Sequence, residues 1–94
     1  MKRKLIVPAS ISAEWRTFGV PRDVTVRFWI YVHAEMPEKY ESVRKERDHD
    51  DRGFRHQKVI KSNTGEAFRI IIFVDDTTTA DHLIITELRC IHRK

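Results

Sequence analysis

The stretch 66-EAFRIIIFVDDTTTADHLIITELRCIHRK-94 decides the fold. Two apolar runs, FRIIIFV and HLIITEL, flank the polar segment DDTTTAD, a pattern typical of two strands joined by a turn. The first run is apolar on both faces, so we predict that it lies centrally in a sheet and is covered by helices. The last run continues into a cluster of cations with a histidine, which raises the question of a functional site.

The residues before this pair extend the same pattern. GFRHQKVIK, residues 53–61, is typical of a strand, and SNTGE, residues 62–66, is typical of a turn. We therefore predict a three-stranded antiparallel meander over residues 54–92, with residues 66–75 in the middle.

The N-terminal residues predict a strand followed by a helix. RKLIV, residues 3–7, is typical of a short strand that ends at Pro8. SISAEWRTF, residues 10–18, has helical spacing, and Gly19 suits the end of a helix. The face of this helix that we expect to be buried carries Ile11, Trp15 and Phe18.

Residues 24–34, VTVRFWIYVHA, fit two structures. Apolar residues alternate and β-branched and aromatic side chains dominate, so propensity favours a strand. Helical spacing is satisfied as well, and the preceding helix favours a helix packed on the sheet. With a helix here the chain is an α+β domain, residues 1–94, with element order β-α-α-β-β-β and an antiparallel sheet whose N-terminal helices pack on one face.

Composition limits the classes of function. The net charge of +4 favours anionic partners such as nucleic acid, an acidic protein or a membrane surface. One cysteine excludes an intramolecular disulfide and a multi-cysteine zinc site. The N-terminal apolar run is too short for a signal peptide and no run is long enough to span a membrane, so we expect a cytoplasmic protein without a membrane partner.

Strong enzyme motifs are absent from the sequence. The acidic segment 48-DHDD-51, with His56 nearby, matches no metal-site template, and a solvated loop is the favoured interpretation. Cys90 is expected to be a buried structural cysteine. His33 and the aromatic residues are expected to be structural, the latter in the core: Trp15, Trp29 and Tyr31.

Basic residues gather where the predicted strands meet. In an antiparallel meander the start of the central strand lies beside the end of the next strand, so Arg69 is predicted to lie near residues 89–94. This gathering favours a site for a phosphate-rich substrate, or else reflects strand ends that are polar because they are solvated. The residues concerned are Arg52, Arg55, His56, Lys58 and Lys61 on the first meander strand, Arg69 on the second, and Arg89, His92, Arg93 and Lys94 on the third.

Three segments of the chain resemble the RelE/ParE toxin superfamily, the small toxins of bacterial toxin–antitoxin systems. SISAEWRTFG is similar to the first helix of RelE-type toxins, and HQKVIKSNTGEAFRIIIFVDD to their lysine-bearing strand, turn and central strand. LIITELRCIHRK is similar to their last strand. The resemblance spans nearly the whole chain, implies the β-α-α-β-β-β fold and favours a helix at residues 24–34.

The resemblance also implies an activity. Its mRNA-cleaving members work on the ribosome, without metal or cofactor, by attack of a 2′-hydroxyl on the adjacent phosphate, and a cognate antitoxin protein inhibits them. It implies a charge-stabilising role for Arg69, with Lys58 and Lys61 as the lysines of the preceding strand and Arg93 or Lys94 as the last strand's arginine. His92 resembles the acid of YafQ-like members. Nucleic-acid contacts are expected from Arg52, Arg55, His56, Arg89 and Lys94.

The sequence departs from the RelE pattern at one point. RelE-type chains continue into a C-terminal segment with a catalytic tyrosine, whereas the given sequence ends at Lys94. Either His92 or His56 takes the acid–base role, or the protein is not a nuclease. The alternative function is that of a small non-enzymatic inhibitor, either a ParE-like gyrase poison or a phage-encoded protein.

Overall fold

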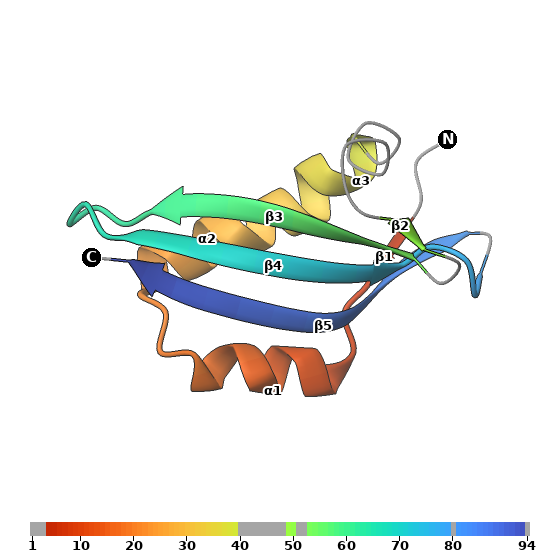
Figure 1. The fold of residues 1–94 in the computed structure, drawn as a ribbon, viewed down its shortest axis with the longest axis horizontal. Helices are drawn as coiled ribbons and strands as arrows, with labels where there is room; N and C mark the ends of the chain where they lie inside the picture. The colour runs from red at the N-terminus through yellow and green to blue at the C-terminus, as the bar shows by residue number, and fades with distance from the viewer. Residues whose placement is uncertain (1–3, 40–48, 51–52, 80, 94) are drawn as a thin grey trace.

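A computed structural model describes residues 4–39, 49–50, 53–79 and 81–93. In this part of the chain one mixed sheet has the strand order β1-β5-β4-β3-β2 (Figure 1). The α+β class and the order β-α-α-β-β-β are confirmed, with the short β2 as an addition. The elements are β1 (Lys4–Ile6), α1 (Ala9–Thr17), α2 (Arg22–Ile30), the π-helical η1 (Tyr31–Glu35), α3 (Met36–Glu38), β2 (His49–Asp50), β3 (Gly53–Lys61), β4 (Ala67–Asp75) and β5 (His82–Arg93).

The predicted antiparallel meander is confirmed, with β4 in the middle. β3 and β4 pair from Phe54 opposite Val74 to Lys61 opposite Ala67, and β4 begins opposite the end of β5 at Arg93. A register shift at Phe73 and Val74 interrupts the β4–β5 ladder, which is typical of a β-bulge. Beyond it, β5 pairs in parallel with β1, so the sheet is mixed at this edge.

Residues 24–34 are helical, as the family resemblance implied and against their strand propensity. Val24, Phe28 and Val32 are fully buried, whereas Val26 and Ile30 are 48% and 58% exposed. A strand would place all five side chains on one face, and only a helix separates them in this way. Among the described residues no helix is long and apolar enough to cross a membrane.

A widened turn joins α2 to α3. The backbone N–H of Met36 donates to the carbonyl of Tyr31, five residues earlier, as in a π-helix. Pro37 follows, and it has no N–H to donate to the preceding turn. The wide turn therefore accommodates the proline within a continuous helical segment, and it brings the neighbours Tyr31 and Val32 into the core together.

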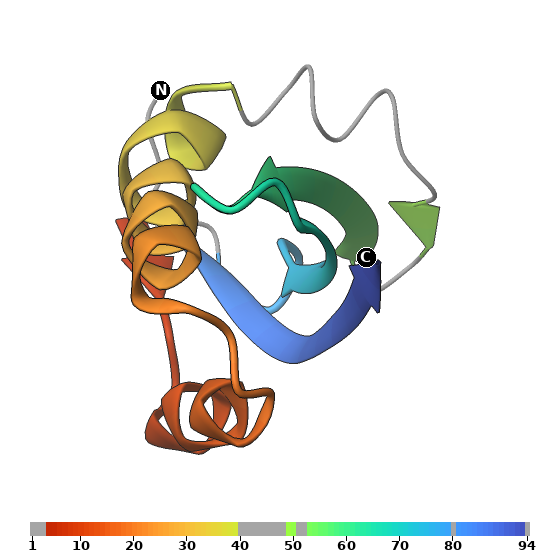
Figure 2. The ribbon, with the colours of Figure 1, turned by 90° about the vertical axis from the view of Figure 1, so that its left-hand side faces the viewer.

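The core lies between the helices and one face of the sheet (Figures 1 and 2). Trp15 of α1 stacks on Phe28 of α2, with ring centroids 4.3 Å apart and planes 5° from parallel. The indole Nε1–H of Trp15 also donates to Thr25 Oγ1 at 3.1 Å, which satisfies its polar group. Trp15 therefore joins α1 to α2, and it has the core position predicted for it, as does buried Tyr31.

Candidate nucleic-acid interface

The two faces of the sheet differ in cover and in charge. On β4 the residues Phe68, Ile70, Ile72 and Val74 are buried on the helix side, and the residues between them are only partly buried. We call the second side the open face. By strand alternation and register, its residues are Arg55, Gln57, Val59 and Lys61 on β3, Ala67, Arg69, Ile71 and Phe73 on β4, and Glu87, Arg89 and Ile91 on β5.

Arg69 lies in the middle of the open face, between two exposed apolar residues. The register places Val59 on one side of it and Ile91 on the other, and these are 49% and 43% exposed. The Arg69 Nε–H is shielded from solvent and has no hydrogen-bond acceptor among the described residues. A buried unpaired donor costs about 1–3 kcal/mol, which makes Arg69 a candidate for a functional role.

Lys61 lies diagonally across the ladder from Arg69. Lys61 pairs with Ala67, two residues before Arg69, and such diagonal neighbours lie roughly 7–8 Å apart. Arg93 lies opposite Ala67 on the other side, and its side chain is outside the described part of the structure. The register thus gathers three basic residues at this end of the sheet, as predicted for Arg69 and the end of the last strand.

Further along the open face, the cations alternate with aromatic and acidic groups. Arg89 Nε forms an ion pair of 2.7 Å with Glu87, and its guanidinium lies 5.3 Å from the ring centroid of Phe73. Arg55 lies opposite Phe73 on β3. Glu87 offsets part of the charge of Arg89, and the open face also carries the cations Arg55, Lys61 and Arg69.

Lys58 and His56 lie on the helix side and do not join Arg69. His56 is buried, and its Nε2 forms a hydrogen bond with the hydroxyl of Tyr31. Lys58 Nζ lies 4.5 Å from the ring centroid of Tyr31. Strand alternation explains this outcome, since residues 56 and 58 share a face with the core residues Phe54 and Ile60. Neither side chain is presented with Lys61 on the open face.

His92 lies at the same end of the sheet but on the helix side. Its ring stacks on Phe68, with centroids 4.4 Å apart, and its Nε2 lies 2.5 Å from Glu66 Oε2. A carboxylate on one ring nitrogen fixes the orientation of an imidazole and leaves the other nitrogen for a proton transfer. Glu66 was not predicted, although the pairing of Phe68 with His92 places it next to this end of β5.

Cys90 has the structural position predicted for it. It is partly buried and packs against the core on the helix side. Burial raises the pKa of its thiol, which disfavours the thiolate form that a nucleophile requires. Exposed His33 lies 6.0 Å from the ring of Trp29, between ring centroids, and Trp29 is partly buried against the core, in agreement with structural roles for both.

Two predicted site residues lie outside the described residues. They are Arg52 and Lys94. Of the acidic segment, for which a solvated loop was the favoured interpretation, Asp48 and Asp51 also lie outside the described residues, and the side chains of His49 and Asp50 are likewise not described. Within the described residues, no group of three or more histidine, cysteine, aspartate and glutamate side chains is placed to hold a metal ion.

Comparisons with known proteins leave the family undetermined. A scan against protein-family models, a search of curated proteins and a search of solved structures each found no significant match for this chain.

Proposed function

We propose that this protein is a RelE-type toxin that binds mRNA on the open face of its sheet and cleaves it on the ribosome in the cytoplasm. The observation that carries the proposal is Arg69, whose shielded Nε–H has no acceptor among the described residues and which is flanked by Val59 and Ile91 and diagonal to Lys61. The cations suit phosphates, and the exposed apolar side chains suit the faces of unpaired bases. A cognate antitoxin protein inhibits this activity.

The proposed reaction transfers a phosphoryl group within the RNA. The 2′-hydroxyl gives its proton to water as its oxygen attacks the adjacent phosphorus, the bond to the 5′-oxygen breaks, and a 2′,3′-cyclic phosphate remains. Arg69 and Lys61 stabilise the negative charge that develops on the phosphate oxygens, and a guanidinium offers two parallel donors for them. His92, oriented by Glu66, protonates the leaving oxygen from the rim of the sheet.

A second function is favoured by one specific observation. His92 lies on the helix side whereas Arg69 lies on the open face, so an RNA that meets both has to cross the rim of the sheet. An open face without an acid would bind an anionic target and leave it intact. The alternative is therefore a non-enzymatic inhibitor that blocks a host or phage target.

Controlled expression in cells distinguishes the two functions. Wild type, Arg69→Lys and His92→Ala are expressed at matched levels from a tightly repressed promoter, and growth and mRNA 5′ ends are recorded. The nuclease proposal predicts new 5′ ends for wild type and a cleavage rate about a hundred- to thousand-fold lower for Arg69→Lys, as expected when a preorganised donor is displaced. Growth arrest without new 5′ ends supports the inhibitor, and equal cleavage by all three proteins contradicts the proposed site.

A further inference from the structure

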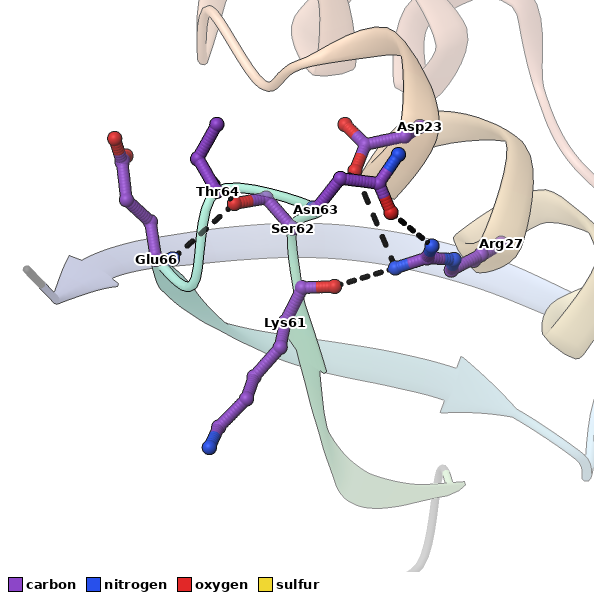
Figure 3. A network of polar contacts seen from close by, with 7 residues as sticks. All are labelled: Asp23, Arg27, Lys61, Ser62, Asn63, Thr64 and Glu66. Atoms are coloured by element: carbon purple, nitrogen blue, oxygen red, sulfur yellow. Dashed lines mark hydrogen bonds and ion pairs between the residues drawn. The ribbon is translucent and has the colours of Figure 1, made fainter.

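A network of exposed polar contacts joins α2 to the turn between β3 and β4 (Figure 3). Arg27 Nη1 donates to the carbonyl oxygen of Lys61 at 2.5 Å, and its Nη2 donates to Asn63 Oδ1 at 2.6 Å. The backbone N–H of Asn63 donates to Asp23 Oδ2 at 2.7 Å. Asp23 lies one helical turn before Arg27, with 4.0 Å between its Oδ2 and Nη1 of Arg27. We call these four residues the hairpin clamp.

The clamp acts where the β3–β4 ladder ends. Lys61 is the last residue of β3, and its pair with Ala67 is the last pair of the ladder. Within the turn, the Ser62 N–H donates to Glu66 O at 2.8 Å, which closes the hairpin on itself. Arg27 joins the helix layer to the sheet, because its guanidinium reaches from α2 to the end of β3. The two planar donors of one arginine fix both Lys61 and Asn63.

The side chain of Lys61 points away from the helix while its carbonyl points toward Arg27 (Figure 3). Its ammonium group is on the open face, diagonal to Arg69, and like charges at that spacing repel each other. A free strand end would relieve the repulsion by moving Lys61 outward. The clamp holds the Lys61 backbone at the end of the ladder, and this fixes the point from which the ammonium group is presented on the face of Arg69.

We propose that Arg27 is a positioning residue, which holds Lys61 beside Arg69 so that both cations meet one stretch of RNA backbone. The inference rests on the proposed RNA binding by the open face. Arg27 acts through its hydrogen bonds and not through its charge. Exposed ion pairs and hydrogen bonds of this kind contribute little to folding stability, so the clamp affects binding more than it affects unfolding.

The experiment measures the affinity of the full chain for a short fluorescein-labelled single-stranded RNA by anisotropy at several salt concentrations. The variants are Lys61→Ala, Arg27→Ala, Arg27→Lys and the double variant Lys61→Ala/Arg27→Ala. Arg22→Ala is the matched control, because Arg22 is exposed on the same helix and its loss changes the net charge equally. Thermal unfolding of each variant shows that it is folded.

The positioning role predicts that Arg27→Ala and Arg27→Lys weaken binding about as much as Lys61→Ala, and that each lowers the salt slope by about 0.7, as for one phosphate contact. Arg22→Ala is predicted to bind like wild type, and the double variant like Lys61→Ala alone, because the two residues act as one unit.

The results distinguish failure of the positioning role of Arg27 from failure of the proposed function. If wild type binds and Lys61→Ala weakens binding, but Arg27→Ala equals Arg22→Ala, the positioning role is overturned and the proposed function stands. The same holds if the losses from Lys61→Ala and Arg27→Ala multiply in the double variant. If Lys61→Ala has no effect on binding, the positioning role is overturned together with the role of Lys61 in the proposed site, whereas RNA binding by the rest of the open face stands. If folded wild type does not bind RNA at any salt concentration tested, the proposed function fails and the positioning role with it.

Discussion

Substitution of Gly53 by alanine tests the packing of the first two strands of the meander. A Cβ atom at this position would lie 1.9 Å from the carbonyl oxygen of Val74 and 2.9 Å from its carbonyl carbon, both of them backbone atoms of β4. No side-chain rotation relieves such a contact, so β3 must move away from β4. The movement opens the pair between Phe54 and Val74, whose side chains are only 4% and 2% exposed.

The expected loss of unfolding free energy follows from the contribution of the Phe54–Val74 pair. Partial exposure of a buried phenylalanine and loss of one or two ladder hydrogen bonds together cost about 3–5 kcal/mol. For a domain of this size, that loss lowers the midpoint of thermal unfolding by more than about 12 °C. The assay is urea denaturation followed by circular dichroism, with thermal unfolding as a second measure.

Two other glycines supply the controls. At Gly19, with φ of 65°, and at Gly65, with φ of 89°, an added Cβ atom would have no neighbour within 4 Å, so alanine there meets only backbone strain. That strain costs about 1–2 kcal/mol. If Gly53→Ala is as stable as Gly65→Ala, the close approach of β3 to β4 at this end is wrong.

Three further predictions concern other parts of the chain. Trp15→Phe keeps the stacking on Phe28 but loses ring volume in the core and the donor to Thr25, and we expect its loss in urea unfolding to be about 1 kcal/mol smaller in a Thr25→Val background than in wild type. Hydrogen bonds from the Thr78 side chain and from the backbone N–H groups of residues 77 and 78 lower the pKa of Asp75 to about 2. The charged carboxylate therefore stabilises the folded state above about pH 4, and this contribution is lost as the pH falls toward about 2. The contribution is small because solvent screens the exposed carboxylate. Asp75→Asn should therefore lower the unfolding midpoint at about pH 6 but not at about pH 2. Cys90→Ser should lower stability by about 1 kcal/mol and leave RNA cleavage intact, and in native wild type the thiol should react with iodoacetamide more slowly than in urea.

The sequence predicted the strands better than it predicted the faces of the sheet. Turn residues bound the apolar runs of the strands, so strand order and pairing followed from turns and apolar runs. The basic residues were grouped by their place along the strand, but consecutive side chains of a strand point to opposite faces. Lys58 therefore turns toward Tyr31 while Lys61 stays on the open face. Strand alternation, applied to the basic residues as well as to the core, places Lys58 and Lys61 on opposite faces.

The helix at residues 24–34 could not be decided from local preference. Its β-branched and aromatic residues favour a strand. The segment is nevertheless helical, because Phe28 and Val24 pack in the core while Trp15 stacks on Phe28. This is a tertiary contribution that propensity does not contain. The contacts of Arg27 with the hairpin also span sequence separations of 34 and 36 residues. A local sequence pattern does not predict contacts over such distances.

An NMR titration of the full chain with a short single-stranded RNA tests the central claim most directly. If RNA binds on the open face, the amide signals of Val59, Arg69 and Ile91 and the methyl signals of Val59 and Ile91 shift together and saturate with one affinity. The exposed residues Val26 and Ile30 of α2 stay unchanged, because they lie on the outer side of the helix layer. Shifts that concentrate on Val26 and Ile30, or no shifts at all at saturating RNA, would contradict the account.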